Sequence, residues 1–179
     1  GHTTGATATV ELKKGTIDFN NQTCSLGLLN IASSGGSTRR IKLGSSAIEI
    51  KMGSGRNTPL NIFITGSTTG CTVDANTAVI TCTGSYSNAG TVVNASGSDY
   101  NGLSIVLSLN VSGGANIIKK ISGSLILANL TINGIADKRD YYGIAGNPTI
   151  TNLFTVLGNS VTNRVMIQSN VVGTPAVIT

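Results

Sequence analysis

The residues able to do acid–base or nucleophilic chemistry are few in this chain. The only histidine is His2, beside the first residue, where backbone is usually poorly held. A Ser–His–Asp or Cys–His arrangement needs its base fixed to within about half an ångström. We therefore interpret His2 as a solvated residue, and nucleophilic catalysis is not expected.

Carboxylate chemistry is also poorly supported. Glycosidases need two carboxylates about 5–9 Å apart in a cleft. The closest pair in sequence, Asp137 and Asp140, flanks Lys138-Arg139, so mutual neutralisation on an exposed loop over 136–143 is the simpler interpretation. The sequence contains no glycine-rich phosphate loop, no CxxC pair and no His/Cys cluster. The prediction is a protein that is not an enzyme, with no catalytic residue, no metal and no cofactor.

The spacing of the three cysteines bears on whether the protein belongs to an oxidising or a reducing compartment. Cys71 and Cys82 flank a turn at 74–77, and in an antiparallel hairpin centred there they face each other. Directly opposed side chains have Cβ atoms about 4.5–5.5 Å apart, and closer in non-hydrogen-bonded pairs, which brings them into disulfide range. This predicts a Cys71–Cys82 disulfide and an oxidising compartment, the alternative being two reduced thiols that pack as small hydrophobes. Cys24 is then left over as a buried bystander.

Asn-x-Ser/Thr sequons favour export as well. Such sequons mark acceptor sites for N-linked glycans on secreted proteins. Together with the disulfide and the low charge, they predict an extracellular protein of the cell surface that carries N-linked glycans if its source can glycosylate. The sequons begin at Asn21, Asn94, Asn110 and Asn129.

Composition excludes several classes of protein. Only 11% of the 179 residues are charged and mean hydropathy is positive, whereas disordered chains combine low hydrophobicity with high net charge. The apolar runs are far shorter than the roughly 18–20 residues that span a bilayer, so no membrane span is expected. The net charge of +5 comes from scattered short pairs without interleaved aromatics, so no nucleic-acid partner is expected.

Turn signals separate many short β-prone segments. Ten to twelve strands follow one another at 8–14-residue spacing, and no segment is convincingly helical. No repeat of fixed period stands out, which speaks against a solenoid or a propeller. The prediction is an all-β fold, a single antiparallel β-sandwich of Ig-like or jelly-roll type.

The beginning of the chain alternates apolar and polar residues and then reaches a polar hinge. Such a strand pairs either within its own sheet or with a neighbour that lacks one strand, by donor-strand complementation. A contact of that kind is heterologous and propagates head to tail. We expect residues 1–15 to form a donor strand and hinge, and residues 16–179 to form the sandwich. The donor residues are Ala6, Ala8, Val10 and Leu12, and the hinge is Lys13, Lys14 and Gly15.

The alternating arm, the hinge, the GTIDF stretch at 15–19 and the following Cys24 resemble the start of chaperone–usher pilins. Those pilins pair their early cysteine with a strand further along, which this chain does not repeat. Its uncharged, sequon-rich composition is more similar to the glycosylated thread pilus subunits of thermoacidophilic archaea. The resemblance covers residues 1–25 and implies a homopolymer of copies of this chain, a surface filament used for adhesion or biofilm formation.

Two other functions stay open. The chain could be a secreted, monomeric β-sandwich adhesin that binds carbohydrate in an aromatic-lined cleft, or a viral jelly-roll coat protein. The adhesin predicts a cleft built from the only tyrosines, which are Tyr86, Tyr100, Tyr141 and Tyr142.

Overall fold

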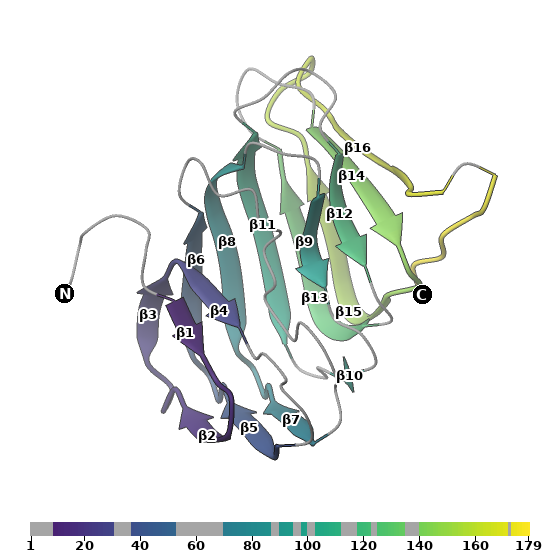
Figure 1. Cartoon of the computed structure of the whole chain (residues 1–179). Helices are drawn as coiled ribbons and strands as arrows, with labels where there is room; N and C mark the ends of the chain where they lie inside the picture. Colours follow the sequence, from purple (N-terminus) through teal and green to yellow (C-terminus); the bar gives the residue numbers. More distant parts are fainter. Residues whose placement is uncertain are drawn as a thin grey trace.

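The computed structural model describes residues 9–30, 37–52, 70–86, 90–94, 98–99, 103–111, 118–122, 125–134, 140–171 and 173–179. Strands form four sheets (Figure 1). Sheet A holds β1 (Thr9–Glu11) and β4 (Leu28–Asn30), and sheet B holds β2 (Gly15–Asp18), β5 (Arg39–Lys42) and β7 (Cys71–Asp74). Sheet C holds β3 (Thr23–Leu26), β6 (Ala47–Met52), β8 (Val79–Tyr86), β10 (Ser98–Asp99), β11 (Ser104–Val111), β13 (Leu125–Asn133) and β15 (Thr149–Leu157). Sheet D holds β9 (Gly90–Asn94), β12 (Ile118–Ser122), β14 (Asp140–Ala145) and β16 (Val165–Ser169).

All strand pairs among the described residues are parallel, and the fold is a β-solenoid. The chain winds around the axis, and each strand pairs with the strand one coil earlier or later. The predicted antiparallel sandwich is therefore wrong, and so is the jelly roll. Parallel neighbours need a long connection between them, which here is the rest of the coil.

The strand pairing in sheet C shows that paired positions recur at a nearly constant interval along the chain, although one longer coil obscures this repeat in the sequence. Ile80 pairs with Ile105 and Ile105 with Leu130, both at an interval of 25 residues. Cys24 pairs with Ile48, and Leu130 with Phe154, both at an interval of 24 residues. Only the step from Ile48 to Ile80 is longer. The expectation of no internal repeat is therefore wrong as well.

Stacked aliphatic side chains form the core inside the coils. Strands of every sheet turn alternate residues inward, so each interior position meets its counterpart in the next coil. Removal of these side chains from water is the main favourable term in folding. The fully enclosed column of sheet C includes Ile48, Ile80, Ile105 and Leu130.

A column of left-handed residues turns the chain between sheets B and C. Asn20, Gly44 and Asn76 have φ of 49°, 61° and 44°, and they precede the paired positions Cys24, Ile48 and Ile80 by the same interval. Glycine and asparagine tolerate this conformation best. The corner residues also bond across coils, because Oδ1 of Asn21 accepts from the Ser45 backbone N–H at 2.8 Å.

Gly44→Ala should destabilise the fold by about 2–3 kcal/mol, from the left-handed backbone and from loss of the Asn21 hydrogen bond. A Cβ at Gly44 would run into the Asn21 amide oxygen. Gly173 is the matched control, since its φ is +78° but nothing lies within 4 Å of an added Cβ. Gly173→Ala should cost about 1 kcal/mol from backbone strain alone. Urea unfolding measures both, and equal losses would contradict the packed corner.

Candidate functional site

A lysine lies fully buried inside the solenoid, held by a carboxylate and a tyrosine. The side chains of Lys119 and Asp140 are 0% and 4% exposed, and Nζ lies 2.8 Å from Oδ1. Nζ also donates to the Tyr142 hydroxyl at 3.3 Å and lies 4.5 Å from the ring centroid, a cation–π contact. Lys119 pairs with Tyr142 across sheet D, and Asp140 precedes Tyr142 by two residues, on the same face of β14.

Burial raises the pKa of the Tyr142 hydroxyl, and repulsion from the Asp140 carboxylate, and from Cys82 once that thiol ionises, raises it further. The Cys82 thiol is itself fully buried, which raises its pKa too. Both groups therefore stay protonated at neutral pH. The Lys119–Asp140 ion pair and the protonated Tyr142 hydroxyl, shielded from solvent, therefore tie β12 to β14 within sheet D.

The predicted exposed loop at 136–143 is wrong where the structure describes it. Asp140 begins β14, is buried, and pairs with Lys119 instead of being neutralised on a surface loop. The cause is the register of sheet D, which turns alternate residues of β14 inward. Asp137, Lys138 and Arg139 lie outside the described residues.

The hairpin that was expected to oppose two cysteines does not form. Cys71 lies on β7 in sheet B and pairs with Arg39, whereas Cys82 lies on β8 in sheet C and pairs with Ile50 and Leu107. A corner separates the two strands, so the geometry behind the predicted disulfide is wrong. Cys82 is a buried free thiol, and the side chain of Cys71 lies outside the described residues.

Cys24 is the other free thiol in the described part of the chain. It lies on β3 and is half-buried, and burial raises its pKa. It is thus less enclosed than the predicted buried bystander, because β3 has a partner strand on one side only among the described residues.

The described part of the expected donor strand lies in its own solenoid. Thr9 and Val10 of β1 pair with Leu28 and Leu29 of β4, and Leu12 is buried in the core. Ala6 and Ala8 lie outside the described residues. The described residues form a solenoid and not the sandwich with a missing strand that the donor-strand interpretation required.

The hinge residues form a turn between two strands of the first coil. Lys13 and Lys14 are exposed bends, and Gly15 begins β2 with a φ of 89°. Its N–H donates to the Thr38 carbonyl at 3.0 Å, in the next coil. The glycine is therefore used for its backbone conformation, within a turn tied to the neighbouring coil.

The sequons differ in how accessible their amides are. Asn21 is exposed at a corner. Asn129 is half-buried, its Nδ2 donates to Ser104 Oγ at 2.8 Å, and its Oδ1 accepts from Asn152 Nδ2 at 2.8 Å. The nitrogen that would carry a glycan at Asn129 is thus engaged between strands. The side chains of Asn94 and Asn110 lie outside the described residues.

The described residues supply neither an aromatic cleft nor a metal centre. Tyr142 is buried, Tyr141 is half-buried on the opposite face of β14, and the side chains of Tyr86 and Tyr100 lie outside the described residues. Where side chains are described, no three His, Cys, Asp or Glu groups approach closely enough to hold a metal ion. The described ranges also contain no helix long and apolar enough to cross a bilayer.

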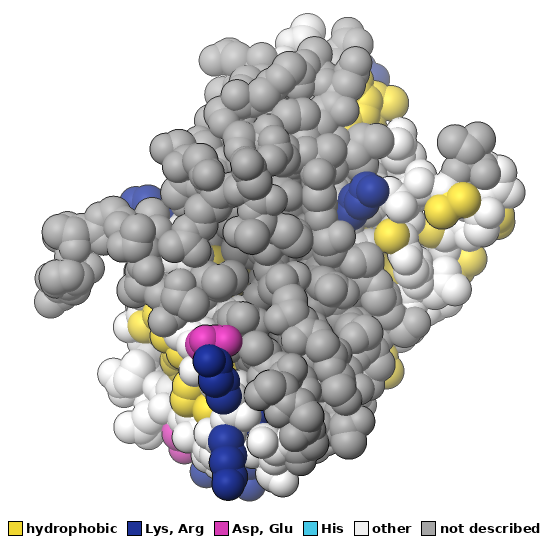
Figure 2. Space-filling model, in the orientation of Figure 1, with side chains coloured by type: hydrophobic (Ala, Val, Ile, Leu, Met, Phe, Trp, Pro, Cys, Tyr) yellow, Lys and Arg dark blue, Asp and Glu magenta, His cyan; other side chains and the backbone are white. Residues whose placement is uncertain are grey.

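Exposed apolar side chains gather on the last coil, which we define as residues 149–171. Leu153, Leu157 and Val161 are 56%, 53% and 85% exposed. Figure 2 shows hydrophobic side chains at the side where Figure 1 places β16 and the C-terminus. Arg164 is the only charged residue between 146 and 179. The other exposed members in or beside the last coil are Val156, Met166, Val171 and Val177, and Val79 is the one such residue elsewhere in the described chain.

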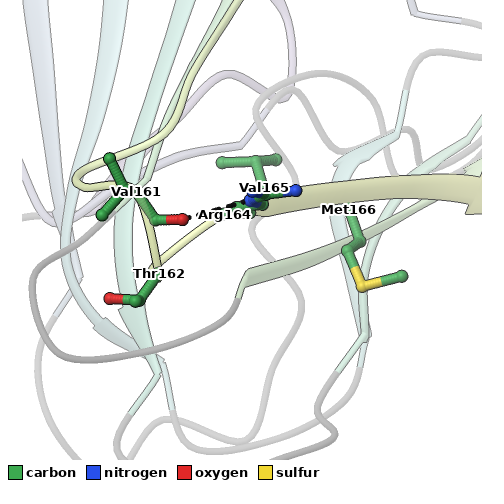
Figure 3. A pocket seen from close by; sticks show the side chains of 5 residues that line it. All are labelled: Val161, Thr162, Arg164, Val165 and Met166. Carbon is green, nitrogen blue, oxygen red and sulfur yellow. Dashed lines mark hydrogen bonds between the residues drawn. The ribbon is translucent and has the colours of Figure 1, made fainter.

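A shallow groove of about 500 Å³ lies beside the start of β16 (Figure 3). Val161 and Thr162 come from the loop before the strand, and Met166 comes from the strand itself. The Arg164 Nε donates to the Val161 carbonyl at 3.2 Å, which fixes the loop against β16. The groove is thus lined by a mixture of apolar side chains, one threonine and one arginine.

The outer edge of β15 is covered only at its start by described residues. The Thr179 N–H donates to the Pro148 carbonyl at 3.2 Å, and the Ile150 N–H donates to the Thr179 carbonyl at 2.6 Å. These two bonds place Thr179 beside Thr149 as a parallel neighbour. Beyond Ile150, β15 has β13 as its only partner strand in the described chain.

No family model, curated protein or solved structure matches this chain. The functional argument therefore depends on the geometry of the chain itself.

Sequence reasoning missed both the buried Lys119–Asp140 pair and the exposed apolar side chains of the last coil, although the sequence contains a sign of each. Lys119 and Asp140 lie 21 residues apart, close to the coil repeat, which places them in neighbouring coils. The near absence of charge after residue 146 is visible in the printed sequence. A charge-poor segment that stays exposed is typical of an interaction surface.

Lys119→Met should destabilise the fold by about 3–5 kcal/mol, because Asp140 would stay buried without its cation. The matched control is Lys42→Met, since Lys42 makes an exposed ion pair with Asp18 at 3.4 Å. Exposed pairs of this kind contribute about 0–1 kcal/mol. Urea unfolding compares the two variants, and a similar loss in both would contradict the buried pair.

Alkaline pH should destabilise the protein through Tyr142 and Cys82. Their folded-state pKa values lie above the unfolded values, so above about pH 9 the unfolded chain loses protons that the folded chain keeps. Stability is complete below this range and falls by up to about 1.4 kcal/mol per pH unit and group above it. Tyr142→Phe should flatten the fall above pH 10. An unchanged slope in that variant would show that Tyr142 is accessible.

Proposed function

We propose that the protein is a non-catalytic structural subunit of an extracellular surface filament, assembled head to tail through its last coil. The observation that carries the proposal is the gathering of exposed apolar side chains on this coil, where Leu153 and Leu157 are more than half exposed. Soluble monomers rarely expose contiguous apolar surface without an interaction to cover it.

The energetics favour a partner on this end. Full burial of one large aliphatic side chain stabilises an association by about 1.5–3 kcal/mol before the costs of association are counted. A charge-poor surface also loses little hydration energy on docking, because few charged groups must leave water. Arg164 lies at the edge of this surface, in the groove beside β16.

A partner that binds one end of a solenoid leaves its own far end free. Such heterologous contacts build open filaments unless the rotation between copies closes a ring. The assembly therefore keeps the homopolymer expected from the sequence and replaces donor-strand insertion, which needs a sandwich. Adhesion or biofilm formation is the use we propose for such a filament, with Asn21 as the exposed sequon available to a glycan.

Leu153→Lys should raise the concentration needed for assembly by about tenfold, since the partial burial of one aliphatic side chain is lost and a charge is introduced at the contact. Val79→Lys is the matched control, because Val79 occupies the same outward column on an inner strand and is 36% exposed. Sedimentation and electron microscopy of the purified chain give the readout.

Three results would overturn the proposal. The unmodified chain could remain monomeric at high concentration, or both lysine variants could assemble as it does. Loss of assembly in both variants would place the contact on the whole outer face of sheet C instead of the last coil.

A further inference from the structure

We propose that the partner of the last coil is the first coil of a second copy, joined by backbone pairing of its β3 with β15. This inference rests on the proposed function and adds the strands and the register. Among the described residues, sheet C alone has a strand in both the first coil and the last. Sheets A and B end before the last coil and sheet D begins after the first, so sheet C is the one sheet that runs from the first coil to the last in the described chain.

The open edges of β15 and β3 are complementary. The Val79 N–H donates to the Ser46 carbonyl of the preceding coil at 2.9 Å, so the next residue, Ile80, turns its N–H to the following coil. Phe154 occupies on β15 the position that Ile80 occupies on β8, as the strand pairing between them shows. Its N–H therefore points away from β13, to the edge of β15 that has no partner strand there in the described chain. Thr23 occupies on β3 the position that Val79 occupies on β8. Its N–H therefore points toward where a preceding coil would lie, which is the open edge of β3 in the described chain.

The two strands also match in direction and in the faces they present. Both belong to one parallel sheet, so a head-to-tail neighbour brings β3 alongside β15 in the same direction. Phe154 and Cys24 are half-buried and pack against the core, whereas Ser25 faces outward. A slip by one residue would turn the apolar side chains outward.

The coil repeat then selects one register. Continuing the column that joins Cys24 to Phe154 places Cys24 of the next copy beside Phe154, and Ser25 beside Thr155. This junction copies a contact that the chain already makes between each of its own coils in sheet C. The occupant is therefore a second copy and not an unrelated apolar segment.

The C-terminal tail occupies only the start of this edge, where Thr179 bonds to Pro148 and Ile150. In the proposed register β3 of the incoming copy begins with Thr23 beside Leu153, and the residues before Thr23 turn away from the strand, because the Gln22 N–H donates to the Phe19 carbonyl. The tail and the incoming strand therefore occupy different parts of the edge. Removal of residues 175–179 should leave the concentration needed for assembly unchanged, and a loss of assembly in the shortened chain would contradict the register.

A cysteine pair tests the register directly. The chain carrying Ser25→Cys and Thr155→Cys is oxidised after assembly, and mass spectrometry identifies the linked peptides, so the native cysteines can stay. Neighbouring strands bring such positions within disulfide range. The control pairs Ser25→Cys with Thr131→Cys, since Thr131 occupies the same outward column one strand further in. The first pair should give at least about tenfold more intermolecular link than the control.

A second pair of variants tests the open edge of β3. Ser25 lies two residues after Thr23, so its N–H also turns to the open edge, where proline is tolerated. Ser25→Pro should keep the monomer folded and stop assembly, whereas Ser25→Ala keeps the N–H and should assemble like the unmodified chain. Circular dichroism checks that both variants remain folded.

The outcomes separate this inference from the proposed function. Filaments in which the Ser25–Thr155 link is absent and Ser25→Pro has no effect would overturn the register and leave the proposed function standing. A chain that stays monomeric would overturn both. Filaments with the predicted link and a block by Ser25→Pro support both.

Discussion

Backbone pairing between successive coils is the constraint on which the rest of this structure depends. In a parallel solenoid each strand takes its partners from the coil before and the coil after, so the length of every coil must return the chain to the same register. Along most of sheet C the chain returns after nearly the same length in every coil. The interior columns, the corners and the buried ion pair all follow from this return. In the described part of the chain, the same constraint leaves the first and last strands of sheet C with a partner strand on one side only.

Much of the local structure could be predicted from the sequence, whereas the topology could not. Alternation of apolar and polar residues marks a strand with one buried face, and most of the predicted strands exist, including the one expected at 103–112. That pattern does not say whether the next strand returns beside it or passes on to another sheet. The turn at 74–77 shows the ambiguity, since Asn76 suits a hairpin and a solenoid corner equally. The long step between Ile48 and Ile80 further concealed the repeat.

The candidate site was predictable only in its composition. The shortage of charge and the lack of catalytic groups were visible in the sequence and favoured an assembly surface. Which apolar residues stay exposed depends on where the stack ends, because Leu153 and Val79 share a column and differ only in their neighbours. Asp140 was assigned to the surface because its neighbours in sequence are basic. Its true partner comes from the previous coil, which no local window reveals.

The buried Lys119–Asp140 pair also distinguishes one coil from the others, because its interior holds charged side chains as well as aliphatic ones. Aliphatic columns are nearly interchangeable, so a growing stack could skip a coil and still bury apolar side chains. A skipped coil would leave Lys119 facing Ile167 instead of Tyr142 and would remove Asp140 from its side. We therefore expect the correct stacking of the coils to be more stable than one that skips a coil. A buried ion pair can in this way fix the order in which otherwise similar coils stack.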